Sequence, residues 1–345
     1  MDKIYHFKGN SAQQSHLIHL NQDQVGFYSE EEVESPVLRQ QPQVGKRNTF
    51  QQKPIEQKVI QFQPQNQQQF KPETRQKGIT VIESDINQRK IAQQRDKQKE
   101  LDNHPYRHLI FSEQINDETF KKHLQLTYRG LVYAKKCLKG PSDKFIQTKM
   151  VTVKDAKVPK GRTLLLDLDE TLIHSCGLRE NPDHVINAYE NGQSSYQIGF
   201  RVRPYCKEFL ETMVQYWDIY VFTASSPSYA SAIVKFLDSE GKYINGILNR
   251  SNCMETKNGF FIKDLRILKG KDLKKMVIVD NLAHSFGFQI ENGIPILEWF
   301  QDKKDTELKC LMNYLIEASQ ANDVRQFNTE RLQLSQLAEY NFEQL

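Results

Sequence analysis

The chain has 345 residues and a formal net charge of +4, from 47 Lys and Arg against 43 Asp and Glu. This length allows one or two domains, and so small a charge points to no nucleic acid or other charged partner. No apolar run approaches the roughly 18–20 residues of a membrane span, and no signal peptide opens the chain. The five cysteines include no close pair, which favours a reducing compartment. We therefore expect a soluble protein of the cytoplasm or the nucleus, with no membrane partner.

Residues 1–104 are predicted to form a disordered, glutamine-rich tail. The first 100 residues contain 21 glutamines and few apolar clusters. Such a segment cannot bury enough apolar surface to offset an ordering cost of about 1–2 kcal/mol per residue. Short apolar islands such as 58–60 have two interpretations, docking sites for partners or plain linker, and the composition favours linker.

Residues 105–158 are predicted to be a helical lead-in. Asn116 or Asp117 can cap a helix over 117–138, and Gly140-Pro141 ends it. Its apolar side chains recur near helical spacing, at Phe120, Leu124, Tyr128, Leu131 and Leu138. We expect this helix to pack on the domain that follows it.

Residues 159–325 are predicted to form an α/β domain, a parallel sheet with helices on both faces. Short apolar runs, typical of buried parallel strands, alternate with segments of helical periodicity. Strands are expected at 163–166, 218–222, 276–279 and 294–297, and helices at 205–217, 227–239 and 305–319. Residues 326–345 are expected to be a C-terminal tail.

One hairpin interrupts this alternation. Residues 185–189 and 196–202 are predicted to be antiparallel strands around Asn191-Gly192, which is a strong turn signal. Because the hairpin follows the first strand, we expect it over the carboxyl edge of the sheet, where open α/β folds bind ligands.

Polar residues follow three of the predicted strands, namely Asp167, Thr223 and Asp280. If these strands are neighbours, the three side chains converge on one crevice. Carboxylates placed in this way repel one another unless a cation offsets their charge. Hard oxygen ligands favour Mg²⁺.

Five ordered features resemble the FCP/SCP branch of the haloacid dehalogenase superfamily, the phosphatases of the RNA polymerase II carboxy-terminal domain and their relatives. The run from Asp167 to Ser175 resembles the first motif, and Arg203-Pro204 follows it. Residues 221–225, 263–265 and 277–281 resemble the second, lysine and last motifs. The resemblance covers about residues 160–325 and implies a Rossmann-like parallel sheet with a small inserted hairpin.

This resemblance implies a Mg²⁺-dependent phosphatase that acts on phosphoserine and phosphothreonine in proteins. Asp167 would attack phosphorus and form an aspartyl-phosphate, while Asp169 would serve first as general acid and then as general base. Thr223 and Lys263 would complete the catalytic set by binding phosphoryl oxygens.

The resemblance also implies residues around this catalytic set. Four are expected to contact the substrate or its phosphate: Thr171, Ser225, Tyr229 and Arg250. The Mg²⁺ ligands would be Asp167, the backbone carbonyl of Asp169, and Asp280 or Asn281.

Two departures from the family pattern bear on the substrate and the metal. Leu282-Ala283 replace the usual Ser-Pro after Asn281, on the metal side of the site. Ser226 replaces an apolar residue that helps to form a proline pocket. The second change weakens the case for Ser-Pro peptides as substrates and leaves the phosphatase chemistry untouched.

Two alternatives were weighed against a protein phosphatase. The first is a catalytically silent scaffold that binds phosphoproteins, whose usual mark is the loss of the nucleophile or the acid/base residue; Asp167 and Asp169 are both present. The second is a small-molecule phosphatase of the same superfamily, which often carries a large cap domain. Only about 27 residues separate Ser175 from Arg203, enough for a hairpin, and an open site favours a protein substrate.

Overall fold

The computed structural model describes residues 99–156, 159–190 and 194–340. Most of the predicted tail, residues 1–98, lies outside these ranges, as does the Asn191-Gly192 turn. Residues 99–104 were also assigned to the tail, yet 99–102 are helical and Leu101 is buried. The described fold therefore begins before the expected boundary. No helix in these ranges is both long and apolar enough to cross a membrane.

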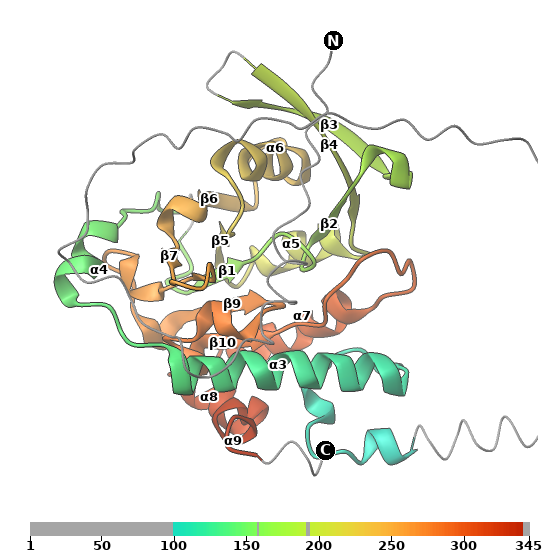
Figure 1. Ribbon diagram of the computed structural model, residues 1–345, viewed down its shortest axis with the longest axis vertical. Helices are drawn as coiled ribbons and strands as arrows, with labels where there is room; N and C mark the ends of the chain where they lie inside the picture. Colours follow the sequence, from blue (N-terminus) through green and yellow to red (C-terminus); the bar gives the residue numbers. More distant parts are fainter. Residues whose placement is uncertain (1–98, 157–158, 191–193, 341–345) are drawn as a thin grey trace, which may run out of the picture. The chain divides into compact units, whose positions relative to one another are not determined.

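A five-stranded parallel sheet forms the centre of the fold, in the order β10-β9-β1-β5-β6 (Figure 1). The fold class is therefore as predicted. All four residues of β1 are buried, which explains the continuous apolar run before Asp167. One strand, β6, was not predicted, because Asn245-Gly246 interrupts its apolar pattern. The strands are β1 Thr163–Leu166, β5 Asp218–Phe222, β6 Ile244–Leu248, β9 Met276–Asp280 and β10 Gly293–Pro295.

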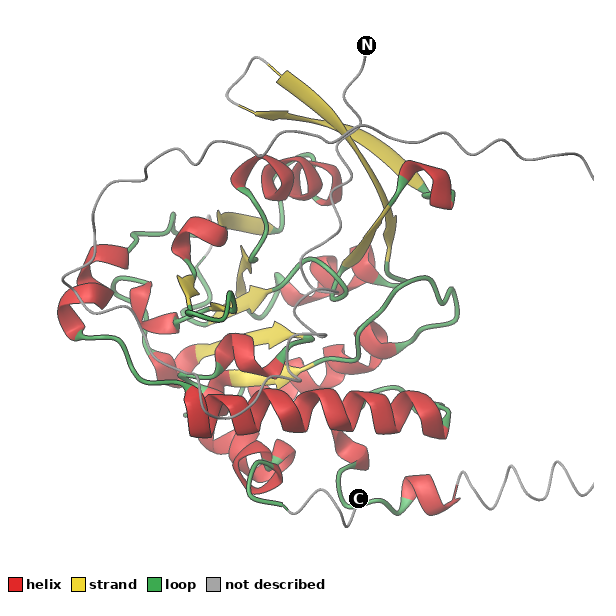
Figure 2. Cartoon of the chain, viewed as in Figure 1, coloured by secondary structure: helices red, strands yellow, loops and turns green. Residues whose placement is uncertain are grey.

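Helices flank this sheet, and the inserted strands extend from it (Figure 2). Three helices were predicted within the α/β domain, and their bounds are α5 Cys206–Met213, α6 Pro227–Leu237 and α7 Glu307–Ala318. α5 packs against α7. Across this contact the indole nitrogen of Trp217 donates a hydrogen bond to the carbonyl of Leu315 at 3.1 Å.

The lead-in contains two helices, α3 Asp117–Cys137 and α4 Asp143–Lys149. The side chain of Asn116 caps α3 by accepting a hydrogen bond from the backbone nitrogen of Thr119 at 2.8 Å. α3 buries Phe120, Leu124 and Leu131, and its contacts include the segment after β9 (Figure 1). The expectation that it packs on the following domain is therefore correct.

The expected C-terminal tail is helical over most of its described part. α8 spans Val324–Leu332 and α9 spans Leu334–Leu337, with Leu332, Leu334 and Leu337 buried. Between the helices Gln333 has a left-handed φ of 52°. This break interrupts the helical spacing of the leucines, so no single helical period runs through the segment.

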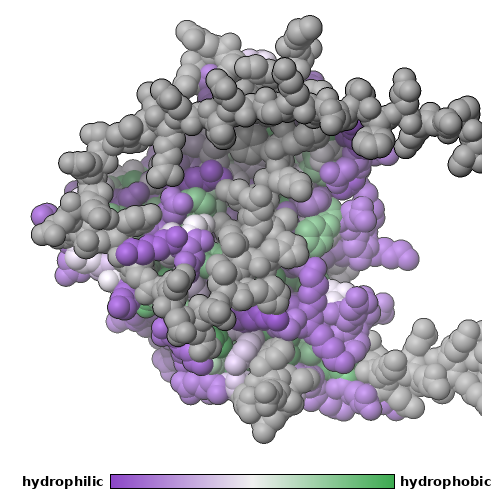
Figure 3. Space-filling view, viewed as in Figure 1, coloured by the Kyte–Doolittle hydropathy of each residue, from purple (hydrophilic) through white to green (hydrophobic). Residues whose placement is uncertain are grey.

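The inserted hairpin belongs to a three-stranded antiparallel sheet of order β2-β4-β3. Its strands are β2 Ile173–Cys176, β3 His184–Glu190 and β4 Ser194–Val202, and β3 contacts α6. Two further short strands pair as a hairpin, β7 Met254–Glu255 and β8 Phe261–Ile262. Short 3₁₀ helices occur at η1 Arg107–Leu109, η2 Leu178–Glu180, η3 Arg250–Asn252, η4 Leu265–Ile267, η5 Leu273–Lys275, η6 Ala283–Phe286 and η7 Ile290–Asn292. On the face seen in Figure 3 the coloured surface is mainly hydrophilic, with small separate hydrophobic areas.

Candidate active site

The carboxyl ends of β1 and β9 bring two aspartates together. The backbone nitrogen of Asp167 still donates to Val279 of β9 at 3.0 Å, so its carboxylate leaves the sheet beside Asp280. Lys263 lies between the two. Its Nζ donates to Oδ1 of Asp167 at 2.5 Å and to Oδ2 of Asp280 at 2.6 Å. The structure therefore gathers three of the predicted site residues into one buried cluster.

The charges of this cluster do not cancel. Burial raises the pKa of the Asp167 carboxyl, the Lys263 ammonium opposes that rise, and the Asp280 carboxylate adds to it. Burial would lower the pKa of Lys263, but the two carboxylates outweigh burial and raise it. Lys263 is thus an ammonium that favours the ionised form of Asp167 at 2.5 Å. One ammonium lies between two buried carboxylates, and a second cation would offset the repulsion that remains between Asp167 and Asp280.

Asp169 is turned back by the loop that follows β1. Glu170 has a left-handed φ of 58°, which bends the chain away from the strand direction. Ser225 Oγ donates to Oδ2 of Asp169 at 2.7 Å, and the Tyr229 hydroxyl donates to Oδ1. Burial raises the pKa of Asp169 to about 6, with Glu170 adding to the rise and the Tyr229 and Ser225 hydroxyls lowering it. A carboxyl titrating in this range suits a group that first gives and then accepts a proton.

Ser225 and Tyr229 were predicted to contact the substrate or its phosphate. In the structure their hydroxyls donate to the carboxylate of Asp169, the predicted acid/base, and their contact with a substrate stays a prediction. Tyr229 lies in the first turns of α6, and Ser225 lies in the loop between β5 and α6. Ser225 of the second motif and Tyr229 just after it are therefore hydrogen-bonded to Asp169 of the first motif.

Thr223 and Arg250 lie on this same loop side of the site. Thr223 is buried, and its Oγ1 accepts a hydrogen bond from the backbone nitrogen of Ser225 at 3.1 Å. Arg250 donates from Nε to the carbonyl of Ala224 at 2.7 Å and stacks over Phe261 at 5.1 Å. Among the residues described, no hydrogen bond joins Arg250 to Asp167 or Asp169. Arg250 thus supports the second-motif loop.

Thr171 ends the first motif in a fully buried position. Its hydroxyl has no hydrogen-bond partner within the described part of the chain. Its carbonyl accepts a hydrogen bond from Nη1 of Arg203 at 3.1 Å. Arg203 also makes two 2.9 Å hydrogen bonds to Asp305. Sequence reasoning gave Arg203 no role, although a buried arginine needs a buried acid and Asp305 begins the last predicted helix.

The donor groups around Asp280 fit Mg²⁺. Asp280 Oδ1 accepts a hydrogen bond from the backbone nitrogen of Leu282 at 2.8 Å. Asn281 is buried, and its Oδ1 is a buried acceptor that no described donor reaches. Over the same ranges, no three His, Cys, Asp or Glu side chains form a metal-binding group by themselves. The predicted set differs in kind, because it combines Asp167 and Asp280 with an amide oxygen, a backbone carbonyl and substrate oxygens.

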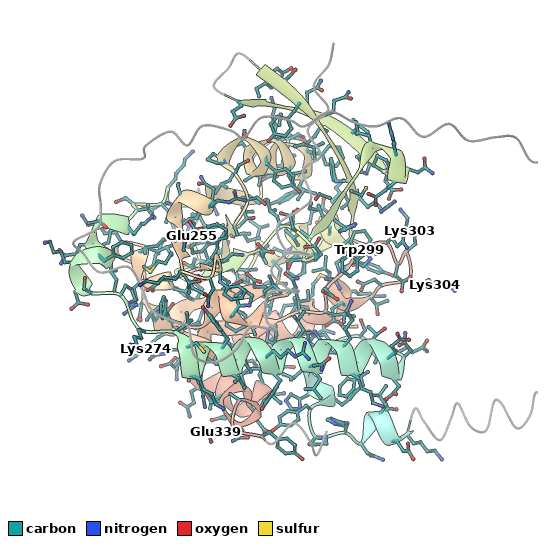
Figure 4. The ribbon with its side chains drawn as sticks, in the orientation of Figure 1. Glu255, Lys274, Trp299, Lys303, Lys304 and Glu339 are labelled. Carbon is teal, nitrogen blue, oxygen red and sulfur yellow. The ribbon has the colours of Figure 1, made fainter. Side chains whose placement is uncertain are left out.

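The loop after β10 closes the first-motif side of the site. The backbone nitrogen of Trp299 donates to the carbonyl of Glu170 at 2.9 Å, and Glu170 pairs with His174 at 3.0 Å. Figure 4 shows Trp299 where this loop leaves the sheet, while Lys303 and Lys304 point outward farther along it. The loop thus anchors the turn that carries Asp169.

Together, the parallel sheet, the aspartate pair after its central strand, and the lysine and aspartate from later segments define a phosphatase domain of the haloacid dehalogenase type. Residues 162–325 match the family described as NLI interacting factor-like phosphatase. This part of the chain belongs to that family, the FCP/SCP branch, as the motifs indicated.

Several curated proteins are similar over this segment. "CTD small phosphatase-like protein 2" of Dictyostelium discoideum is 39% identical over 176 residues, which cover 51% of this chain and 30% of that protein. "CTD small phosphatase-like protein 3" of Caenorhabditis elegans is 42% identical over 156 residues, covering 44% of this chain and 53% of that one. The human "Carboxy-terminal domain RNA polymerase II polypeptide A small phosphatase 2" is 38% identical over 161 residues, with 47% and 58% covered. The chain thus spans less than two thirds of each of these relatives.

Proposed function

We propose that this protein is a Mg²⁺-dependent phosphoprotein phosphatase that removes phosphate from serine and threonine through an aspartyl-phosphate at Asp167. The observation that carries the proposal is a difference between the three aspartates. Asp169 and Asp280 each accept hydrogen bonds on both carboxylate oxygens. In the described part of the chain Asp167 accepts one, on Oδ1, and its Oδ2 is left for attack on phosphorus.

In the first step, an Asp167 oxygen forms a bond to phosphorus as the bond from phosphorus to the substrate oxygen breaks. Protonated Asp169 gives its proton to the departing serine or threonine oxygen, so the alcohol leaves neutral. Ser225 and Tyr229 are hydrogen-bonded to the two oxygens of that carboxyl group, which fixes the orientation of the group that gives the proton. The phosphoryl group then resides on Asp167.

In the second step, water attacks phosphorus and the bond to Asp167 breaks. Asp169, now ionised, takes a proton from the attacking water, and inorganic phosphate leaves. Lys263 stays within hydrogen-bond reach of Asp167 throughout and places a fixed positive charge beside the reacting oxygens. The Thr171 hydroxyl, which has no described partner, and the Thr223 hydroxyl are assigned to the phosphoryl oxygens.

Asp167, the Asp169 carbonyl, Asp280 and Asn281 would hold Mg²⁺, which when bound neutralises charge on the phosphoryl oxygens. The buried Asn281 acceptor and the uncompensated carboxylates support this assignment.

The proposed substrates are phosphorylated proteins. The insertion after β1 is a three-stranded sheet rather than a large cap, which leaves room for a polypeptide segment to approach Asp167. The similar human protein is named as a small phosphatase of the carboxy-terminal domain of an RNA polymerase II polypeptide, in keeping with a peptide substrate. Ser226, the N-cap of α6, stands where the family has an apolar residue of the proline pocket, so no preference for Ser-Pro is assigned.

The test uses the full-length protein with a phosphoserine peptide, a phosphotyrosine peptide and an aryl phosphate, each with and without Mg²⁺. We expect Mg²⁺-dependent release of phosphate, faster from phosphoserine than from phosphotyrosine. Asp167→Asn should abolish release, whereas Asp272→Asn, at the exposed cap of η5, should not. Undiminished hydrolysis by Asp167→Asn would overturn the proposal. A wild-type protein that binds the phosphopeptide without cleaving it would instead indicate a scaffold.

A further inference from the structure

We propose that helix α3, which precedes the family segment, positions the metal-binding side of the site by packing against η6. The inference rests on the proposed function, because it concerns the Mg²⁺ ligands named there. α3 ends at Cys137 and the family match begins at residue 162. The helix is therefore a part of this chain to which the family match assigns nothing.

Close approach of α3 to η6 depends on two glycines, one on each side of the contact. A β-carbon on Gly130 of α3 would lie 2.8 Å from the backbone nitrogen of His284 and 3.1 Å from Cβ of Ala283. A β-carbon on Gly287, just after η6, would lie 2.6 Å from Leu138 Cδ1 and 2.8 Å from Ala134 Cβ. Neither glycine has a left-handed backbone, so close packing and not backbone conformation explains them.

Hydrogen bonds link η6 and its cap to Asp280 and to Lys263. The segment begins two residues after Asn281, and Leu282, its cap, donates its backbone nitrogen to Asp280 Oδ1 at 2.8 Å. The Ser285 carbonyl accepts a hydrogen bond from the backbone nitrogen of Lys263 at 2.6 Å. A displacement of η6 would therefore move Asp280 and Lys263 together.

An aromatic cluster extends this contact to the strand that leads into Lys263. Tyr133 of α3 packs edge-on against Phe260 with ring centroids 4.8 Å apart. Phe260 in turn packs against His284 at 4.9 Å. Phe260 immediately precedes β8, and Lys263 immediately follows it. One face of α3 thus contacts η6, which follows Asp280 and Asn281, and also Phe260, which precedes β8 and Lys263.

Interiors are close-packed, so a methyl group forced into this contact displaces one of its walls. At Gly130 the nearest wall is the backbone of η6 itself, which has no flexible end to swing away. The displacement should change the geometry of Asp280 and Asn281, on which Mg²⁺ binding depends, more than it changes the stability of the helix. Alanine favours a helix interior over glycine by about 1 kcal/mol, which at Gly130 offsets part of the overpacking cost of about 1–3 kcal/mol.

The experiment measures Mg²⁺ binding to the full-length protein by calorimetric titration, and the rise in melting temperature that Mg²⁺ produces. Asp280→Asn defines the signal that belongs to the site. Gly130→Ala and Gly287→Ala should each weaken Mg²⁺ binding about tenfold, the scale of overpacking strain.

Two matched variants separate positioning from a general loss of structure. Gly140→Ala adds the same methyl group after α3 with nothing within 4 Å, and should leave Mg²⁺ binding unchanged. Adding Ala134→Gly to Gly287→Ala removes the rigid methyl group that faces Gly287, while Leu138 Cδ1, at the end of a flexible side chain, can turn away. The pair should restore Mg²⁺ binding even though glycine lowers helix stability.

Unchanged Mg²⁺ affinity in folded Gly130→Ala, or an equal loss in Gly140→Ala, would overturn the inference. If Gly130→Ala does not fold, the Gly287→Ala and Ala134→Gly pair decides the question by the same criterion. The Mg²⁺ titrations contain no substrate, so they test this inference alone. Hydrolysis that does not require Asp167 would instead count against the proposed function.

Discussion

The buried pair of Arg203 and Asp305 offers a quantitative test of how the fold holds the first motif. Arg203 Nε and Nη2 donate to the two Asp305 oxygens at 2.9 Å each, while Nη1 donates to the Thr171 carbonyl at 3.1 Å. Arg203 is 1% exposed, so water cannot replace a lost partner. The nearby Glu307 carboxylate already accepts hydrogen bonds from Phe111 and from Ser112. We therefore predict that Asp305→Asn leaves the guanidinium without a hydrogen-bonded carboxylate.

The cost should be large. Removing one member of a buried ion pair typically costs about 3–5 kcal/mol. Losing two charge-assisted hydrogen bonds, at about 1.5–3 kcal/mol each, gives the same range. Replacing both partners with apolar residues, as in Arg203→Met with Asp305→Leu, should recover most of this free energy of unfolding. Activity should not recover, because the Thr171 carbonyl then loses its donor.

Urea unfolding of the wild type, Arg203→Met, Asp305→Leu and the double variant forms a double-mutant cycle, and Asp305→Asn is measured beside it. We expect Asp305→Asn to lose about 3–5 kcal/mol of unfolding free energy and the double variant to be close to wild type. A loss below about 1 kcal/mol for Asp305→Asn, or a double variant no more stable than the single ones, would refute the reasoning.

Two further predictions concern proton positions. Tyr229→Phe removes the hydroxyl that donates to Asp169, so kcat for a phosphoserine peptide should fall about tenfold, the worth of one hydrogen bond to a charged group. An aryl phosphate, whose phenol leaves without a proton, should be affected less, and an equal loss for both substrates would contradict this role. Burial lowers the pKa of His123 to about 4 from 6.5; the unfolded chain therefore binds its proton first as pH falls, and stability present above pH 6.5 is lost towards pH 4. Between pH 7 and pH 5 this residue should cost about 2 kcal/mol. Urea unfolding should show this loss of unfolding free energy in wild type but not in His123→Gln, whose amide can still donate to Leu109. An equal change of unfolding free energy with pH in both proteins would exclude His123 as its source.

Much of the sheet could be read from the sequence because its signals are local. The runs before Asp167 and Asp280 are apolar on both faces, and buried parallel strands require that pattern. The aspartates at their ends could be placed in the same crevice, and β1 does lie beside β9. The order of the strands could not be read, because pairing is not recorded in either strand alone.

The remainder depends on contacts between distant segments. Nothing local to Tyr229 shows that its hydroxyl reaches Asp169, because α6 and the first-motif turn are 60 residues apart in the chain. The glycines of the α3 contact are similar in this respect. Gly130 lies in a helix interior, and the close approach of η6 explains why a glycine stands there. The C-terminal helices were missed because Gln333 breaks their common period.

The covalent step at Asp167 is the central claim, and its phosphorylated form is the most direct evidence for or against it. Full-length Asp169→Asn protein would be incubated with Mg²⁺ and an aryl phosphate, quenched in acid, and digested for mass spectrometry. Without its general base this variant should accumulate the intermediate. The account predicts one added phosphoryl group on the peptide that contains Asp167, absent when Asp167→Asn is added. Turnover with no phosphorylated peptide, or a phosphoryl group that persists in the Asp167→Asn background, would contradict it.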